Sequence, residues 1–122
     1  MKITPIGRVV KNEDGRNQIE VFSEYQDGLY RIDEIDEILV LYIFDQIEEV
    51  RLRVHPRGDP HVPKVGVFAS RSPLRPNRIA TSIVKLIKVK DNILIIGDID
   101  AFDGSPVIDI KPVKRFNEDN LR

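Results

Sequence analysis

Residues 83–99 read Ile-Val-Lys-Leu-Ile-Lys-Val-Lys-Asp-Asn-Ile-Leu-Ile-Ile-Gly-Asp-Ile, and this stretch decides the fold class. Two β-branched runs, Ile83 to Val89 and Ile93 to Ile99, lie on either side of a short polar break. Asp and Asn tolerate the backbone conformations that tight turns require. We therefore expect an antiparallel hairpin whose two strands are joined at Asp91-Asn92.

Further runs of the same kind, separated by turn signals, lie on both sides of this hairpin. One helical segment is expected around Gln26 to Ile32, and no strand–helix alternation of a doubly wound sheet is visible. The chain is therefore predicted to be all-β: a small, mainly antiparallel barrel with at most one or two short helices. The other runs are Ile6 to Val10, Ile19 to Phe22, Ile38 to Phe44, Val50 to Val54, Val65 to Ala69 and Val107 to Ile110.

The size and composition of the chain indicate a single domain, 1–122. It has 122 residues, 41% of them apolar and 32% charged, with no internal repeat. No run approaches the ~20 apolar residues of a membrane-spanning helix, and the first residues lack the apolar region of a signal peptide. The chain has no cysteine, which excludes disulfides, thiol nucleophiles and cysteine-ligated metals. We therefore expect a cytoplasmic protein without a membrane partner.

The positive charge is concentrated in the middle of the chain. Residues 51–90 contain ten Lys or Arg and one acid, whereas residues 1–50 contain five against twelve and residues 91–122 four against seven. Such a distribution allows one face to bind a polyanion while the rest of the surface keeps the protein soluble. The alternative is that these charges are scattered over a solvated surface.

Two familiar catalytic arrangements are weak in this sequence. His55 and His61, with Asp59 between them, could form a metal site or the acid–base pair of a ribonuclease. Because no third strong ligand lies nearby in the sequence, we expect surface histidines and no bound metal. Ser70 and Ser72 lack the Gly-x-Ser-x-Gly pattern, so a serine hydrolase is not indicated.

The densest group of candidate binding residues lies between Gly66 and Ile79. Pro73 and Pro76 restrict the backbone around them, so the arginines of this loop are held by a stiff segment. Pre-ordered arginines suit an anionic ligand, because less entropy is lost when they bind carboxylate or phosphate. The alternative is that the prolines only shape a loop whose arginines pair with the acidic parts of the chain.

Three motifs stand out along the chain: Pro56-Arg57-Gly58-Asp59-Pro60, the segment from Gly66 to Ile79, and Asp103-Gly104-Ser105-Pro106-Val107-Ile108-Asp109-Ile110-Lys111-Pro112. In order and spacing they resemble the TsaA-like (YaeB-like) family, whose characterised members are tRNA (N6-threonylcarbamoyladenosine) methyltransferases. The resemblance covers nearly the whole chain, from Ile6-Gly7 onward. It implies a small β-barrel that binds S-adenosylmethionine, forms a homodimer and methylates an adenosine beside the tRNA anticodon.

The resemblance also implies which positions form the cofactor site. Some lie directly after the apolar strand that ends near residue 44. Others lie in the proline-containing loop and in the strand after that loop. The rest lie in the Asp-rich segment near the end of the chain. The implied cofactor-binding residues are Asp45, Gln46, Arg71, Thr81, Asp100, Asp103, Gly104 and Ser105.

The sequence departs from the family pattern at several positions. Asp45 stands where a His is usual, Arg78 where a proline follows the asparagine, Thr81 where an aliphatic residue is usual, and Val113 in place of a tyrosine. The Pro-Arg-Gln segment expected near Asn17 to Glu24 is not recognisable. Longer relatives also have a larger middle loop and a C-terminal extension. The exact adenosine derivative and the tRNA are therefore left open.

The implied reaction is a direct methyl transfer from a sulfonium to an adenine nitrogen, which needs no covalent nucleophile. The protein must align donor and acceptor and exclude water. The catalytic residue is not identified by the sequence: Asp103 or Asp109 is a guess for the proton acceptor, and water is the alternative.

The basic segment is the candidate RNA-binding face, and the rival function is a non-catalytic RNA-binding barrel. Alternation predicts that Leu52 and Val54 face the core while the arginines beside them share the opposite face. For the homodimer we expect an apolar contact to which Leu74 or Phe102 contributes. The expected phosphate-binding residues are Arg51, Arg53, Arg57, Lys64, Arg75 and Arg78.

Overall fold

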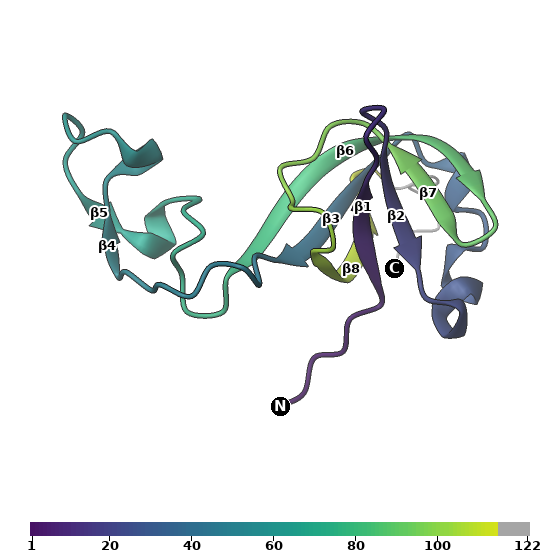
Figure 1. Cartoon of the computed structure of the whole chain (residues 1–122), viewed down its shortest axis with the longest axis horizontal. Helices are drawn as coiled ribbons and strands as arrows, with labels where there is room; N and C mark the ends of the chain where they lie inside the picture. The colour runs from purple at the N-terminus through teal and green to yellow at the C-terminus, as the bar shows by residue number, and fades with distance from the viewer. Residues whose placement is uncertain (115–122) are drawn as a thin grey trace.

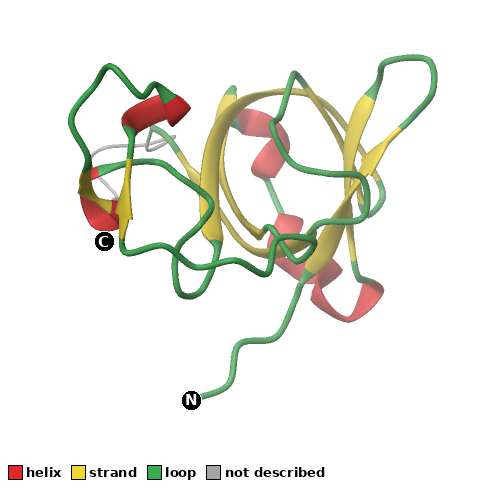
Figure 2. Ribbon diagram, turned by 60° about the vertical axis from the view of Figure 1, so that its left-hand side comes forward, coloured by secondary structure: helices red, strands yellow, loops and turns green. Residues whose placement is uncertain are grey.

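The computed structural model describes residues 1–114 and consists of a β-barrel and a projecting arm. The strands of the barrel pair in the order β1-β2-β7-β6-β3-β8, and β8 pairs with β1 to close the sheet. All pairs are antiparallel, which confirms the predicted all-β, mainly antiparallel fold. In Figure 2 the strands curve round a common centre. Their bounds are β1 (Gly7–Lys11), β2 (Asn17–Val21), β3 (Glu37–Ile43), β6 (Ile79–Lys90), β7 (Ile93–Ile96) and β8 (Pro106–Pro112).

The hairpin predicted from residues 83–99 is confirmed. β6 and β7 are antiparallel, with Lys90 opposite Ile93, so Asp91 and Asn92 form a two-residue turn. Asp91 has a φ of 53°, in the left-handed region that Asp tolerates better than most residues. Asn92 donates a side-chain hydrogen bond to the carbonyl of Val21 at 2.8 Å, which joins the hairpin to β2.

The core of the barrel follows from the alternation of the strands. In β3, the side chains of Ile38, Val40 and Tyr42 are buried, whereas the residues between them are half-buried on the outer face. Inward residues of the other strands complete one cluster of buried apolar side chains. The cluster contains Val9, Ile19, Val21, Ile35, Ile38, Val40, Tyr42, Val84, Leu86, Leu94, Ile96, Ile99, Ala101 and Val107.

The described residues contain four short 3₁₀ helices rather than the one or two expected. They are η1 (Ser23–Leu29), η2 (Ile32–Glu34), η3 (Pro56–Gly58) and η4 (Val67–Ala69). The helix expected around Gln26 to Ile32 falls on η1 and the start of η2. The two are separated because Arg31 adopts a φ of 67°, which a continuous helix does not allow. None of these helices is long and apolar enough to cross a membrane.

The arm, residues 45–78, connects β3 to β6 and projects from one end of the barrel (Figure 1). Its only strands in the described structure are β4 (Arg53–Val54) and β5 (Val65–Gly66), which form a separate two-stranded sheet. The strands predicted over Val50 to Val54 and Val65 to Ala69 are thus shorter. The predicted burial of Leu52 is wrong, because its side chain is 64% exposed: it precedes the short strand, and the arm has too few layers to cover it.

Candidate functional site

A cavity of about 620 Å³ lies where the barrel meets the arm. The ends of β3 and β6 form one side of it, and the first residues of the loop after η4 form another. Three of the predicted cofactor residues, Arg71, Thr81 and Asp100, lie together in its wall. The full lining is Tyr42, Phe44, Ser70, Arg71, Arg75, Ile79, Ala80, Thr81 and Asp100.

Arg71 is held against the barrel from the arm. Its Nη2 donates hydrogen bonds to the carbonyl oxygen of Thr81 at 2.9 Å and to the Thr81 hydroxyl at 3.0 Å. Because Thr81 lies in β6, these bonds join the loop of the arm to the wall of the barrel. The guanidinium keeps unused N–H donors and is exposed, so it can contact a bound anion at the same time.

Tyr42 closes the cavity on the barrel side. Its hydroxyl group forms a hydrogen bond of 2.7 Å with the hydroxyl of Ser82, and its side chain is almost fully buried. Burial raises the pKa of the Tyr42 phenol; the hydrogen bond to Ser82 acts in the opposite direction, and the Asp100 carboxylate adds to the increase. The ring of Phe44 packs edge-on against Tyr42 and Phe102, with centroid distances of 5.5 Å to each. The cavity therefore combines aromatic surface with charges of both signs.

The loop after η4 is fixed by hydrogen bonds as well as by its prolines. The Ser70 hydroxyl donates to the carbonyl of Val67 at 2.9 Å and accepts from the amide of Ser72 at 3.2 Å. The Ser72 hydroxyl in turn accepts from the amide of Leu74 at 3.2 Å. Arg75 donates to the carbonyls of Ser70 and Ser72, both at 3.1 Å. These hydrogen bonds are a second cause of the predicted stiffness of this segment, in addition to its prolines.

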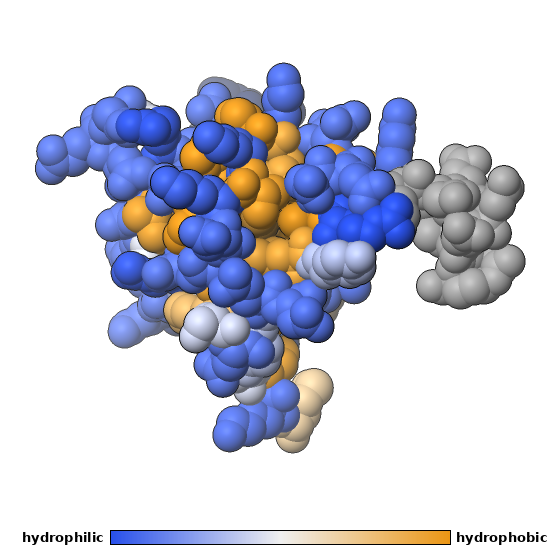
Figure 3. Space-filling view, turned by 90° about the vertical axis from the view of Figure 1, so that its right-hand side faces the viewer, coloured by the Kyte–Doolittle hydropathy of each residue, from blue (hydrophilic) through white to orange (hydrophobic). Residues whose placement is uncertain are grey.

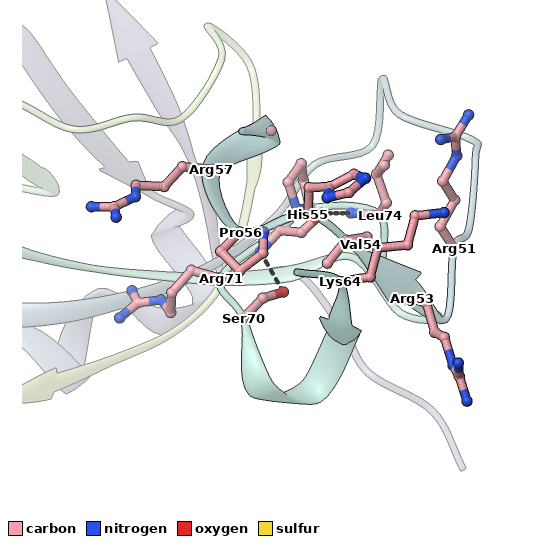
Figure 4. Close-up of a pocket in the computed structure, with 13 residues that line it drawn as sticks. Arg51, Arg53, Val54, His55, Pro56, Arg57, Lys64, Ser70, Arg71 and Leu74 are labelled. Atoms are coloured by element: carbon pink, nitrogen blue, oxygen red, sulfur yellow. Dashed lines mark hydrogen bonds between the residues drawn. The ribbon is translucent and has the colours of Figure 1, made fainter. Parts of the chain in front are cut away.

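A second cavity, of about 640 Å³, lies within the arm and is strongly basic. Arg51, Arg53, Arg57 and Lys64, four of the six predicted phosphate-binding residues, line it together with Arg71. In Figure 4, Arg57 and Arg71 extend to the same side of the cavity, whereas Arg51 and Arg53 extend away from them. The cations therefore surround the arm instead of converging on one point, an arrangement that suits an extended polyanion.

The other two predicted phosphate-binding residues lie elsewhere. Arg75 lines the first cavity, and its guanidinium donates hydrogen bonds to carbonyl groups of the loop. Arg78 has a φ of 53°, and its Nε atom is buried without a hydrogen-bond partner in the described structure. Its place at the junction of arm and β6 explains why it does not share the basic cavity. An RNA-binding role for either residue stays a prediction.

Five of the predicted cofactor residues do not line the first cavity. Asp45 and Gln46 are exposed in the turn after β3. Asp103 accepts a hydrogen bond from the amide of Lys11 at 2.8 Å, and Gly104, with a φ of 85°, donates to the carbonyl of Val9 at 2.7 Å. Ser105 is fully buried and its hydroxyl has no partner among the described residues. The Ser105 carbonyl accepts a hydrogen bond from the amide of Val9 at 2.9 Å. The last three residues thus join the segment before β8 to β1, and a cofactor role for any of the five stays a prediction.

The two carboxylates considered as proton acceptors, Asp103 and Asp109, both form hydrogen bonds within the protein. Asp109 forms an ion pair with Lys111 at 3.1 Å and accepts a hydrogen bond from the amide of Ile110 at 2.9 Å. Asp103 is bound to β1, as described above. In contrast, Asp100 lines the cavity and no hydrogen bond or ion pair is recorded for its carboxylate within residues 1–114.

The two histidines have structural positions in the arm. Nδ1 of His55 lies 2.8 Å from the carbonyl of Val62, and the amide of His61 donates to the carboxylate of Asp59 at 2.9 Å. Within the described part of the chain, no three His, Cys, Asp or Glu side chains are grouped so that they could hold a metal ion.

Sequence patterns did not identify Tyr42, Phe44 and Ser70 as residues of the cavity. Residues 38–44 are all apolar, so the sequence does not show that the Tyr42 side chain faces the core. It cannot show that the end of the strand opens to a cavity, because this depends on where the arm leaves the barrel. The Ser70 hydroxyl was considered only as a nucleophile, whereas the structure uses it to hold the loop.

Comparisons with known proteins identify the family of this chain. A family model described as the tRNA-methyltransferase O N-terminal domain matches residues 3–117. This chain belongs to that family. The resemblance noted in the sequence is thereby confirmed, and the stiff loop and the Asp-rich segment both lie within the matched range.

Members of the tRNA-methyltransferase O family with similar sequences include archaeal and bacterial proteins. An S-adenosyl-L-methionine-binding protein of Archaeoglobus fulgidus is 45% identical over 98 residues, covering 80% of this chain and 69% of the relative. A probable S-adenosyl-L-methionine-binding protein of Methanocaldococcus jannaschii is 45% identical, covering 89% of both chains. The tRNA (adenine(37)-N6)-methyltransferase of Escherichia coli is 34% identical, covering 90% of this chain and 49% of the relative.

A solved structure has the same fold. The crystal structure of TrmO matches all of this chain with a TM-score of 0.73 and 25% sequence identity. This chain spans 62% of the length of that structure, so the longer protein has parts that have no counterpart here.

Proposed function

We propose that this protein is an S-adenosylmethionine-dependent methyltransferase that acts on the N6 of a (threonylcarbamoyl)adenosine next to the tRNA anticodon. The observation that carries the proposal is the cavity between barrel and arm, in a chain of the tRNA-methyltransferase O N-terminal domain family. It adjoins a second, basic cavity through the shared residues Ser70 and Arg71. A small cofactor and a long anionic substrate would thus bind side by side.

The residues of the first cavity fit the chemistry of S-adenosylmethionine. This cofactor has a carboxylate, an ammonium group, a ribose, an adenine and a sulfonium. Arg71 offers free N–H donors to the carboxylate. Asp100 has an unengaged carboxylate for the ribose hydroxyls or the ammonium group, and the ring of Phe44 offers an apolar surface to the adenine. The wall thus offers complementary groups to the carboxylate, to the ribose or the ammonium group, and to the adenine.

S-adenosylmethionine carries the reactive methyl group. The task of the protein's own residues would therefore be to position the cofactor and the adenosine. The bound cofactor would supply its methyl group to N6 as its sulfur–carbon bond breaks, and N6 would lose one proton. Phe44, Ile79 and Ala80 line the cavity with apolar surface that excludes water. In this proposal Asp100 binds the cofactor, and Asp103 and Asp109 are engaged elsewhere, so the proton released by N6 would pass to water.

The arm is the proposed tRNA-binding part. Its basic cavity would bind phosphates of the anticodon arm, and the target base would be unstacked to reach the methyl group. We also propose that arm and barrel act as one domain, and that the protein works in the cytoplasm, where tRNA is found.

The rival proposal is a non-catalytic RNA-binding barrel, which needs no cofactor. Calorimetric titration with S-adenosylmethionine separates the two, because only the enzyme is expected to bind it. Mass spectrometry of nucleosides should then detect a methylated adenosine after tRNA from a deletion strain is incubated with protein and labelled cofactor. Absence of both binding and methylation would favour the rival.

We further propose a symmetric homodimer. The side of the barrel facing away from the arm has an apolar patch (Figure 3), and β6 exposes Ile83 and Ile87 at about 60% each. Of the two residues predicted for the contact, Phe102 is 39% exposed and Leu74 is half-buried in the wall of the basic cavity. Light scattering should give twice the mass of the chain; the mass of one chain would exclude the dimer.

A further inference from the structure

One aromatic side chain on the arm is largely exposed to solvent. The side chain of Phe68, in η4, is 77% exposed, although its neighbour Val67 is buried at 1%. The backbone on both sides is fixed: the amide of Val67 donates to the carbonyl of Leu52 at 2.9 Å, and the amide of Ser70 donates to the carbonyl of Val67 at 3.1 Å. The ring is therefore held in solvent by a rigid turn.

One cation accompanies this ring. The guanidinium carbon of Arg75 lies 6.0 Å from the centroid of the Phe68 ring, within the range of a cation–π contact. Arg75 is itself fixed by its hydrogen bonds to the carbonyls of Ser70 and Ser72. Arg75 also lines the first cavity, so the Phe68 ring and that cavity have this residue as a common neighbour.

We propose that Phe68 and Arg75 form a stacking platform for an unpaired nucleobase of the RNA substrate. This inference rests on the proposed function. Exposed aromatic rings beside arginines bind single-stranded nucleic acid because every base can stack on the ring while the cation attracts its phosphate. The base bound here is adjacent to the target base or is the target itself before it enters the cavity. Stacking would thus hold the anticodon loop open.

The surroundings favour RNA over a second protein chain as the occupant. The basic cavity of the arm includes residues 70–74, which directly follow the turn of Phe68. A useful contrast is Tyr30, an aromatic residue that is 83% exposed on the barrel near Asp27 and Asp91. Acidic neighbours disfavour RNA, so Tyr30 is a matched control for exposure without the expected function.

The test compares Phe68→Leu with Phe68→Tyr and Tyr30→Leu. The probe is an anticodon stem-loop RNA that carries 2-aminopurine at successive loop positions. In the wild-type protein, one position should change its fluorescence on binding, because the base exchanges its RNA neighbours for the Phe68 ring. Phe68→Leu should abolish this change and weaken RNA binding by about five- to a hundredfold. Phe68→Tyr should keep both, and Tyr30→Leu should behave as wild type.

Two results would overturn the platform. One is wild-type RNA affinity and fluorescence in Phe68→Leu; the other is a change in the solution mass of that variant, which would place Phe68 in a contact between protein chains. Calorimetry with S-adenosylmethionine provides an independent readout: Phe68→Leu should bind the cofactor as the wild type does. Failure of the wild-type protein to bind cofactor would refute the proposed enzyme, while the RNA measurements would still test the platform.

Discussion

The barrel and the arm of this protein are held together by different forces. Fourteen buried apolar residues form one cluster inside the barrel, whereas Val54 and Val67 are the buried apolar residues of the arm within the described structure. The arm instead uses hydrogen bonds between its own side chains and backbone, such as those of His55, Ser70 and Ser72. A region without a hydrophobic core can still hold cations in defined positions, and this is where the charge of the chain is concentrated.

The largest change in stability is expected from a substitution in the core of the barrel. Ile38→Ala should lower the free energy of unfolding by about 2–5 kcal/mol, because Ile38 is fully buried and its truncation leaves a cavity. Denaturant titration measures this. The matched variant in the arm, Val67→Ala, should leave the unfolding of the barrel nearly unchanged while it weakens tRNA binding. Equal destabilisation by the two variants would show that arm and barrel unfold as one unit.

The next effect concerns the contact that joins the two regions. Arg71→Ala should weaken the binding of S-adenosylmethionine by roughly ten- to a hundredfold, because one charge-assisted contact is lost. Isothermal titration calorimetry gives the dissociation constant, and circular dichroism checks that the variant is folded. Arg53→Ala, which also removes an arginine of the arm but lies outside the first cavity, is the control. An unchanged dissociation constant in folded Arg71→Ala would remove Arg71 from the cofactor site.

A smaller effect tests whether the arm is the phosphate-binding region. tRNA affinity should fall with salt with a log–log slope near −3, taking about four phosphate contacts and the single-strand coefficient of about 0.7. Replacing Arg51 and Arg53 together by glutamine should make this slope less steep by about one unit. The control replaces Lys85 and Lys88, both exposed on β6 of the barrel, and should keep the slope. Wild-type affinity and slope in the arm variant would move the RNA site elsewhere.

The smallest effect is expected on the local stability of the loop after η4. Ser72→Ala removes the acceptor for the amide of Leu74, which should cost about 0.5–1.5 kcal/mol locally. Amide hydrogen exchange should become faster within residues 70–75, with no change in β3 or β6. Faster exchange throughout the barrel would show that this hydrogen bond also stabilises the barrel.

Several features of the fold could be predicted from the sequence because they depend on neighbours in the chain. The β-branched runs predict the strands of the barrel, and Asp91-Asn92 predicts the hairpin of β6 and β7. Leu52 shows the limit of this reasoning. Its alternation with Val54 is that of a strand, but burial also requires a second layer, which the arm does not provide.

The sequence by itself determined the strands of the barrel, the stiff loop with Arg71 and the charge of the middle segment, since short-range pattern and proline geometry are sufficient for each. Only the tertiary structure decided that Arg71, Thr81 and Asp100 share a cavity with Tyr42, and that Asp103, Gly104 and Ser105 join β8 to β1 instead. The reason is that the site forms where the arm leaves the barrel. The pairing of β3 with β6, whose strands are separated by the arm in the sequence, sets that position.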